Sequence, residues 1–107
     1  MKIINSHFYD NSGGFGGAIT IKSGVLESYN NTFEHNVVTT TGGALHVENS
    51  HLISACSAYE NNAAYDGAAI YMFGAVGYLH NDSFVENIAK GVSYLIPNSL
   101  SLPCVIT

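Results

Sequence analysis

The sequence predicts an all-β fold, a right-handed parallel β-helix of about four coils with about 25 residues in each coil. Three observations predict it: two short motifs recur at one period, apolar and polar residues alternate near them, and asparagines recur in columns. The first motif is an aromatic residue followed three positions later by asparagine, at Phe8–Asn11, Phe33–Asn36, Tyr59–Asn62 and Phe84–Asn87. Its aromatic positions are 25, 26 and 25 residues apart.

The second motif is Gly-Gly-Ala followed by an aliphatic residue. It occurs at Gly16–Ile19 and Gly42–Leu45, and with one change at Gly67–Ile70. Two positions after each aliphatic residue comes another apolar residue, at Ile21, Val47 and Met72. This period of two is typical of a strand that is buried on one face.

A unit of this length, with three short strands, cannot bury its apolar face alone. Stacked copies solve the problem, because each strand then pairs with its equivalent in the next coil at a spacing of about 4.8 Å. A helical repeat is the competing architecture, and the frequent Gly, Asn, Ser, Thr and β-branched residues disfavour it. A leucine-rich repeat is disfavoured because its Leu-x-x-Leu-x-Leu spacing is absent.

Two columns rich in asparagine predict internal structural ladders. The first column is Asn11, Asn36, Asn62 and Asn87, and the second is Asn5, Asn30, Cys56 and Asn81. Stacked amides can bond to one another and to turn backbone, which satisfies polar groups inside the coil. Cys56 is expected to be a small buried apolar residue. A disulfide with Cys104 is not expected, because two coils of separation, roughly 9–10 Å, exceed the reach of a disulfide.

Composition and charge exclude several classes of protein. Of 107 residues, only 3 are Lys or Arg and the net charge is −5, so a phosphate-binding nucleic-acid partner is not expected. No apolar run approaches the roughly 18 residues that span a bilayer, so no membrane-spanning segment is predicted. The first twelve residues lack the apolar core of a signal peptide. Two cysteines are too few for a disulfide framework or a zinc site.

The length predicts one domain, residues 1–107, which we expect to be part of a longer solenoid. Open coils expose unpaired strand edges, so the expected partners are neighbouring coils or other copies of the chain that join through the open ends. Residues 96–107 are expected to form a degenerate last coil or a C-terminal cap, because Pro97 and Pro103 lack the N–H that a ladder needs.

Outward positions that follow each aromatic residue hold the candidate metal ligands. Stacking would bring four of them close together: Glu34, His35, Glu60 and Glu86. Carboxylates and an imidazole at one or two strand spacings could hold a divalent cation or form an acid–base pair. A solvated polar face is the simpler interpretation. We therefore expect no cofactor, no metal and no catalytic residues, and the absence of arginine weakens any lyase or hydrolase interpretation.

A contact patch is expected on a different strand. His46 and Glu48 alternate with Leu45 and Val47, which predicts that they point outward. The equivalent outward residues one coil later are Tyr71 and Phe73. Exposed aromatic residues can bind protein or sugar, although aromatic residues also favour strands for their own sake.

The two alternating motifs resemble the repeats of chlamydial polymorphic outer-membrane proteins. The matching segments are Phe8–Asn11, Phe33–Asn36, Phe84–Asn87, Gly16–Ile19 and Gly42–Leu45. The chain departs from the pattern at Tyr59, at Ala68 and in the decayed copy at residues 91–95. The resemblance implies an autotransporter-type passenger with a β-helical fold, a role in adhesion and a location outside the cell or on its surface. The membrane-barrel segment of such proteins is absent from this sequence.

Three functional hypotheses follow. The first is a non-catalytic module of a cell-surface or secreted protein, which serves as an adhesin passenger or a structural scaffold and contacts a host protein, a matrix protein or a glycan. The second is a fragment of a carbohydrate-active β-helix enzyme, such as a polysaccharide lyase or hydrolase. The third is a structural subunit that forms filaments by joining end to end.

Overall fold

The computed structural model describes residues 1–90, and every regular element in this part of the chain is a β-strand. Each coil begins with a strand of the first sheet: β1 (Lys2–Ile4), β5 (Val25–Tyr29), β9 (His51–Ala55) and β13 (Val76–His80). The aromatic motif lies in the second sheet: β2 (His7–Tyr9), β6 (Thr32–Glu34), β10 (Ala58–Glu60) and β14 (Ser83–Val85).

Two further sheets complete each coil. One consists of two-residue strands: β3 (Ser12–Gly13), β7 (Val37–Val38), β11 (Ala63–Ala64) and β15 (Ile88–Ala89). The other has three strands within the described residues: β4 (Ile19–Lys22), β8 (Leu45–Glu48) and β12 (Ile70–Phe73). Each of the first three coils therefore contains four strands, not the three expected. The two-residue strands are too short to show an alternating pattern in the sequence.

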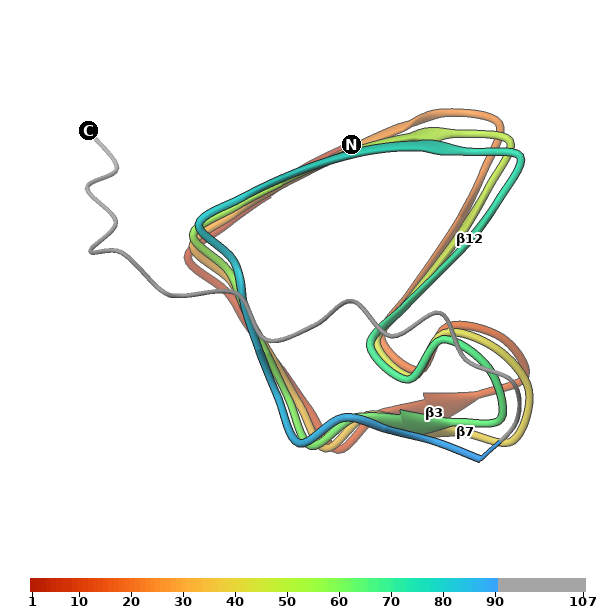
Figure 1. Cartoon of the computed structure of the whole chain (residues 1–107). Coiled ribbons are helices and arrows are strands. Elements are labelled where there is room, and N and C mark those ends of the chain that lie inside the picture. Colours follow the sequence, from red (N-terminus) through yellow and green to blue (C-terminus); the bar gives the residue numbers. More distant parts are fainter. Residues whose placement is uncertain (91–107) are drawn as a thin grey trace.

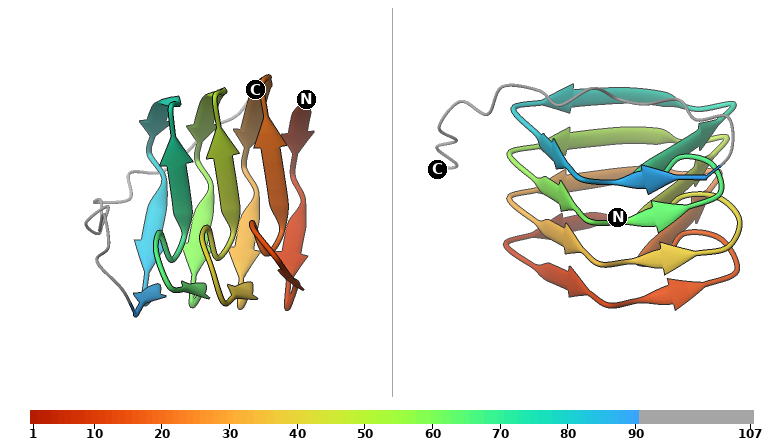
Figure 2. Two further views of the ribbon diagram at one scale, coloured as in Figure 1. Left: turned by 90° about the vertical axis from the view of Figure 1, so that its right-hand side faces the viewer. Right: turned by 60° about the horizontal axis from the view of Figure 1, so that its bottom comes forward.

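All strand pairs are parallel, and each strand pairs with its equivalent one coil away. Seen along the solenoid axis, the coils superimpose (Figure 1), and seen from the side they stack one above another (Figure 2). The observed register joins Phe8 to Phe33 and Ile19 to Leu45, in agreement with the spacings of 25 and 26 residues. These features confirm the predicted parallel β-helix of about four coils.

A column of aromatic rings runs through the interior. The ring centroids of Phe8, Phe33, Tyr59 and Phe84 follow one another at 4.9, 4.9 and 4.8 Å, and the ring planes differ by 6° or less. Aliphatic side chains of the other sheets fill the rest of the core, and four of them are fully buried: Leu26, Leu45, Val47 and Leu52. Burial of an aliphatic side chain contributes about 1.5–3 kcal/mol to stability, so the interior columns hold the coils together.

The first asparagine column forms a continuous ladder of hydrogen bonds. Within it, the amide Nδ2 of Asn36 donates to Oδ1 of Asn62, and the amide Nδ2 of Asn62 donates to Oδ1 of Asn87, both at 3.0 Å. Each Oδ1 also accepts the backbone N–H of the asparagine in the preceding coil. Asn36 and Asn62 are fully buried, so the ladder satisfies polar backbone groups that water cannot reach.

The second asparagine column does not lie inside, which corrects the expectation. Asn5, Asn30, Cys56 and Asn81 sit at a corner of the coil with φ between 52° and 57°, and Asn5 and Asn30 are exposed. Asn30 still bonds to Asn5 through its amide, at 2.7 Å, but on the outside. The left-handed corner interrupts the period of two, and the residue that follows it points inward instead.

The inner column at this corner is Ser6, Asn31, Ser57 and Asp82, and the last three of these are buried. Asn31 shows the arrangement that an amide adopts there. Its Oδ1 accepts the N–H of Ser6 at 2.8 Å, and its Nδ2 donates to the carbonyl of Ile3 at 2.9 Å. Asp82 occupies the equivalent site two coils later, and its Oδ1 accepts the N–H of Ser57 at 2.8 Å.

Burial raises the pKa of Asp82 to about 6, although the hydrogen bonds from Ser57 and Ser54 favour the carboxylate. The folded chain therefore binds this proton more tightly than the unfolded chain, whose aspartate titrates near pH 4. The stability that the protonated group contributes is complete below about pH 4 and is lost as the pH rises to about 6.

The substitution Asp82→Asn is expected to stabilise the fold at neutral pH, because the amide can bond to the Ser54 carbonyl as Asn31 bonds to Ile3. The gain in melting temperature over the wild type should be small at pH 4 and should grow as the pH rises to 7. Thermal unfolding followed by circular dichroism at several pH values measures this difference. The reverse change, Asn31→Asp, is the matched control and should destabilise the fold most above pH 6. A gain in melting temperature that does not depend on pH would contradict the raised pKa of Asp82.

Cys56 is disulfide-bonded in the structure, so the expectation of a buried free cysteine is wrong. The expectation placed Cys56 in an inner column, whereas it lies at the outward corner with φ of 57°. Cys104 and the degenerate coil or cap expected at residues 96–107 lie outside the described residues.

Candidate functional site

Two of the expected metal ligands, Glu34 and Glu60, lie on the outer side of the sheet β2–β6–β10–β14. Glu34 and Glu60 are neighbours in register, as the columns predict. Their surroundings are those of a solvated surface: Glu34 Oε2 lies 3.2 Å from Nε2 of His7, and the ring of His35 lies against the ring of Tyr9.

The fold brings too few of the four expected ligands together to form a metal site. His35 and Glu86 are exposed and sit at a corner of the coil, with φ of 55° and 53°, rather than on a strand beside Glu34 and Glu60. Among residues 1–90, no three His, Cys, Asp or Glu side chains are arranged to hold a metal ion. The carboxylate of Glu34 instead contacts the imidazole of His7 on the same surface.

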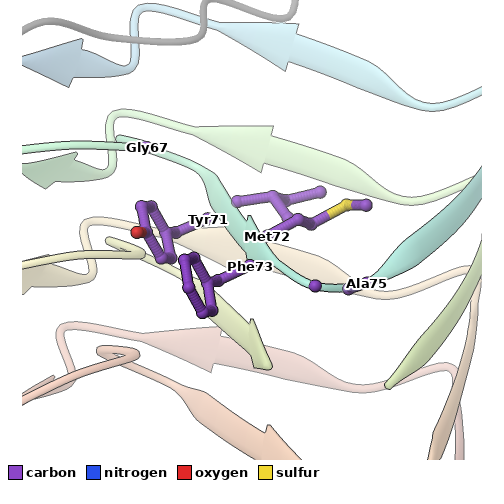
Figure 3. Close-up of a pocket in the computed structure, with 7 residues that line it drawn as sticks. Gly67, Tyr71, Met72, Phe73 and Ala75 are labelled. Atoms are coloured by element: carbon purple, nitrogen blue, oxygen red, sulfur yellow. The ribbon is translucent and has the colours of Figure 1, made fainter. Parts of the chain in front are cut away.

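The outer side of the sheet β4–β8–β12 is chemically different. Its outward residues form two rows in register: Thr20, His46 and Tyr71 in one row, and Lys22, Glu48 and Phe73 in the other. Tyr71 and Phe73 project side by side from β12, and Met72 projects to the opposite side (Figure 3). The predicted direction of the Tyr71 and Phe73 side chains is therefore observed.

His46 also faces outward, as the alternation predicts, but only 4% of it is exposed. The ring of Phe15 packs against it with centroids 5.2 Å apart, and the ring of Tyr71 stacks on it, also at 5.2 Å. Nδ1 of His46 is hydrogen-bonded to the Thr41 hydroxyl at 2.9 Å. Side chains from a neighbouring loop thus cover a residue that the strand alone would expose.

The covering loop is the glycine-rich turn that precedes β4, β8 and β12. Gly16 and Gly42 adopt φ of +38° and +73°, a left-handed conformation that favours glycine. Stacked turns bond to one another, and the N–H of Gly16 donates to the carbonyl of Thr41 at 3.0 Å. These bonds fix the position of Phe15, which projects from the first of the turns next to the outer side of the sheet.

Charged groups complete the surface. Nζ of Lys22 lies 4.0 Å from Glu48 Oε2 and 5.7 Å from the centre of the Phe15 ring. Glu48 Oε1 lies 3.7 Å from His46 Nε2. We name the surface formed by Phe15, Lys22, Glu48, Tyr71 and Phe73 the aromatic face.

Sequence reasoning missed the part that the loop contributes. Phe15 carried a usable signal, because a large apolar residue between two glycine pairs has no structural reason to be in a flexible turn. Thr41 and Asp66 occupy the equivalent position in the next two turns and form a parallel bridge. Oδ1 of Asp66 is buried without a hydrogen-bond partner among the described residues.

A hollow of about 590 Å³ lies at the far end of the aromatic face, beside β12. Among the described residues, its lining comes from one stretch of chain: Gly67, Ile70, Tyr71, Met72, Phe73, Gly74 and Ala75. Within residues 1–90, β12 pairs only with β8. The hollow therefore follows an edge of the sheet that has no strand partner in this part of the chain.

The described residues contain no helix long and apolar enough to cross a membrane. The chain matches no protein-family model, and comparisons with curated proteins and with solved structures gave no significant match.

Proposed function

We propose that the chain is a non-catalytic β-helical module of a cell-surface or secreted protein, in which a rigid scaffold presents the aromatic face as an adhesin-type contact surface. The single observation that carries the proposal is the gathering of aromatic side chains on this face. Phe73 and Phe15 are 60% and 52% exposed, and Tyr71 lies beside Phe73. The resemblance of the two repeat motifs to polymorphic outer-membrane proteins supports the surface location.

The interior supports the scaffold part of the proposal. Aromatic rings and asparagine amides that define the repeat are used in stacking and in hydrogen bonds between coils. Exposed aromatic rings on the outside contribute little to this packing, and a large exposed apolar side chain that is held in place is typical of a contact site.

In an attachment assay, beads coated with the chain should attach to cultured epithelial cells or to a matrix-coated surface more than albumin-coated beads do. The double substitution Phe15→Ser with Phe73→Ser should lower attachment to the albumin level. Tyr78→Ser is the matched control, because Tyr78 is 63% exposed on β13, in a different sheet, and it should leave attachment unchanged. Attachment of the wild type at the albumin level would refute the proposal.

One observation favours a second candidate, a carbohydrate-active enzyme. The Thr41 hydroxyl contacts the His46 imidazole, and the imidazole in turn lies near the Glu48 carboxylate. These are the types of group that acid–base chemistry uses. His46 is covered on both faces, which limits the access of a substrate. Measuring the release of reducing or unsaturated ends from a panel of polysaccharides, with and without calcium, tests this candidate, and turnover that is lost in His46→Gln would establish it.

The filament hypothesis is tested by measuring the molecular mass of the particles in solution. Sedimentation over a wide range of concentration, with negative-stain microscopy, distinguishes a monomer from end-joined copies. Growth of the mass with concentration would establish that the ends of the solenoid are a working interface.

A further inference from the structure

We propose that the aromatic face binds a neutral saccharide chain that lies along the solenoid axis. This inference rests on the contact function proposed above and names its ligand class. A pyranose ring has an apolar C–H face that packs on an aromatic ring and hydroxyl groups that need hydrogen-bond partners. A saccharide site therefore needs exposed rings with donors and acceptors beside them.

On the aromatic face, exposed rings have charged side chains beside them. Phe73 and Tyr71 provide adjacent rings on the third coil, and Phe15 provides a ring at the first coil. Between Phe15 and Phe73 lie Lys22 and Glu48, which follow one another in register with Phe73. A sugar that packs on Phe73 would have the Glu48 carboxylate as an acceptor one strand away, and the next sugar would reach the Lys22 ammonium as a donor.

The period of the surface fits a polymer of sugars. Equivalent residues of successive coils are separated by the strand spacing of about 4.8 Å, which is close to the length of one pyranose unit in an extended chain. The file of rings Phe15, His46 and Tyr71 follows this period, with successive centroids 5.2 Å apart. Sugars two units apart along the axis would therefore meet exposed rings two coils apart, Phe15 at the first coil and Phe73 at the third.

The face is preorganised. The imidazole of His46 packs between the rings of Phe15 and Tyr71, and it is hydrogen-bonded to the Thr41 hydroxyl. Hydrogen bonds between the stacked glycine turns fix the loop that carries Phe15. The side chains of Phe15 and Tyr71 therefore have little freedom to lose when a ligand binds, which lowers the entropic cost of binding.

Charge and size favour a neutral saccharide over other partners. Glu48 lies 4.0 Å from Lys22 and offsets its charge, and the net charge of the chain is −5, so an anionic glycan would be repelled. A stable protein interface involves roughly 20–30 residues on each side, whereas the aromatic face has five. A short stretch of sugars matches this area better.

The experiment is a titration of the whole ¹⁵N-labelled chain with tetrasaccharides, followed by backbone amide NMR. The neutral probes are tetramers of glucose, mannose and N-acetylglucosamine, and the anionic probe is a tetramer of galacturonic acid. At least one neutral probe should shift amides around the aromatic face with a dissociation constant of about 1 mM, as expected for a shallow site. Phe73→Ala should weaken this binding about tenfold or more, and Tyr78→Ala should leave it unchanged.

Three outcomes would overturn the inference. One is the absence of shifts with every neutral probe at about ten times the expected dissociation constant. Another is tighter binding of the galacturonic acid tetramer than of any neutral probe. The third is unchanged binding by Phe73→Ala, when its melting temperature equals that of the wild type and thus shows that the variant is folded.

The attachment assay separates failure of this inference from failure of the contact function. Attachment that depends on Phe73 but survives periodate oxidation of the target surface would leave the contact function standing and overturn the saccharide ligand. Attachment that periodate abolishes would support both.

Discussion

Gly43→Ala is expected to cause the largest loss of stability of any glycine-to-alanine change among residues 1–90. A Cβ atom at position 43 would lie 1.9 Å from the carbonyl oxygen of Ala68 and 2.9 Å from the backbone N and O of Ala63. These atoms belong to the next coil and are held by ladder hydrogen bonds, such as that from Ala63 N–H to the Asn36 carbonyl at 3.0 Å. The coils would have to separate to admit the methyl group.

Overpacking in a core usually costs about 1–3 kcal/mol and occasionally more, and a clash with backbone belongs at the upper end. We expect a loss of about 3 kcal/mol or more, which lowers the melting temperature of a domain this size by about 12 °C or more. Thermal and urea unfolding of the purified variant measure it.

Gly14→Ala is the matched control, because a Cβ at position 14 meets no heavy atom within 4 Å. It should melt within a degree or two of the wild type. Gly17→Ala, where the Cβ would lie 2.2 Å from the Gly43 carbonyl oxygen, should behave like Gly43→Ala. Equal stability of Gly43→Ala and Gly14→Ala would show that the coils are not packed as described.

The second large effect is expected for Asn62→Ala, at the centre of the internal ladder. Oδ1 of Asn62 accepts the N–H of Asn36 at 3.0 Å, and its Nδ2 donates to the carbonyl of Phe33 at 3.0 Å. Truncation leaves both backbone groups buried without these partners. Each such group costs about 1–3 kcal/mol, so we expect a total loss of about 2–5 kcal/mol.

Asn61→Gly is the control for the ladder, one residue earlier in the chain. Asn61 lies at the outward corner with φ of 53°, a conformation that glycine adopts without strain. Urea unfolding should show a clear fall in the midpoint for Asn62→Ala and little change for Asn61→Gly. A midpoint for Asn62→Ala that matches the control would mean that the interior amides do not hold the coils together.

The sequence by itself determined the repeat and therefore the fold. Aromatic residues spaced by 25 or 26 positions pair in register, because a one-residue shift would move Phe33 and its equivalents from the core to the solvent. The second glycine of the Gly-Gly-Ala motif recurs because of the close spacing of the coils: at Gly43 the backbone of the next coil passes too close for a side chain. The asparagine that follows each aromatic residue could be assigned to the interior because it keeps one fixed distance from a buried ring.

Only the tertiary structure decided what happens at the corners and on the outside of the coil. A left-handed residue such as Asn30 changes the side to which the following residue points, so Asn31 is buried and Asn30 is not. Alternation within a strand does not extend through such a corner. The burial of His46 depends on Phe15, which is 31 residues earlier and belongs to another coil. Stacking alone brings these side chains together, because the spacing between coils, not the distance along the chain, separates them.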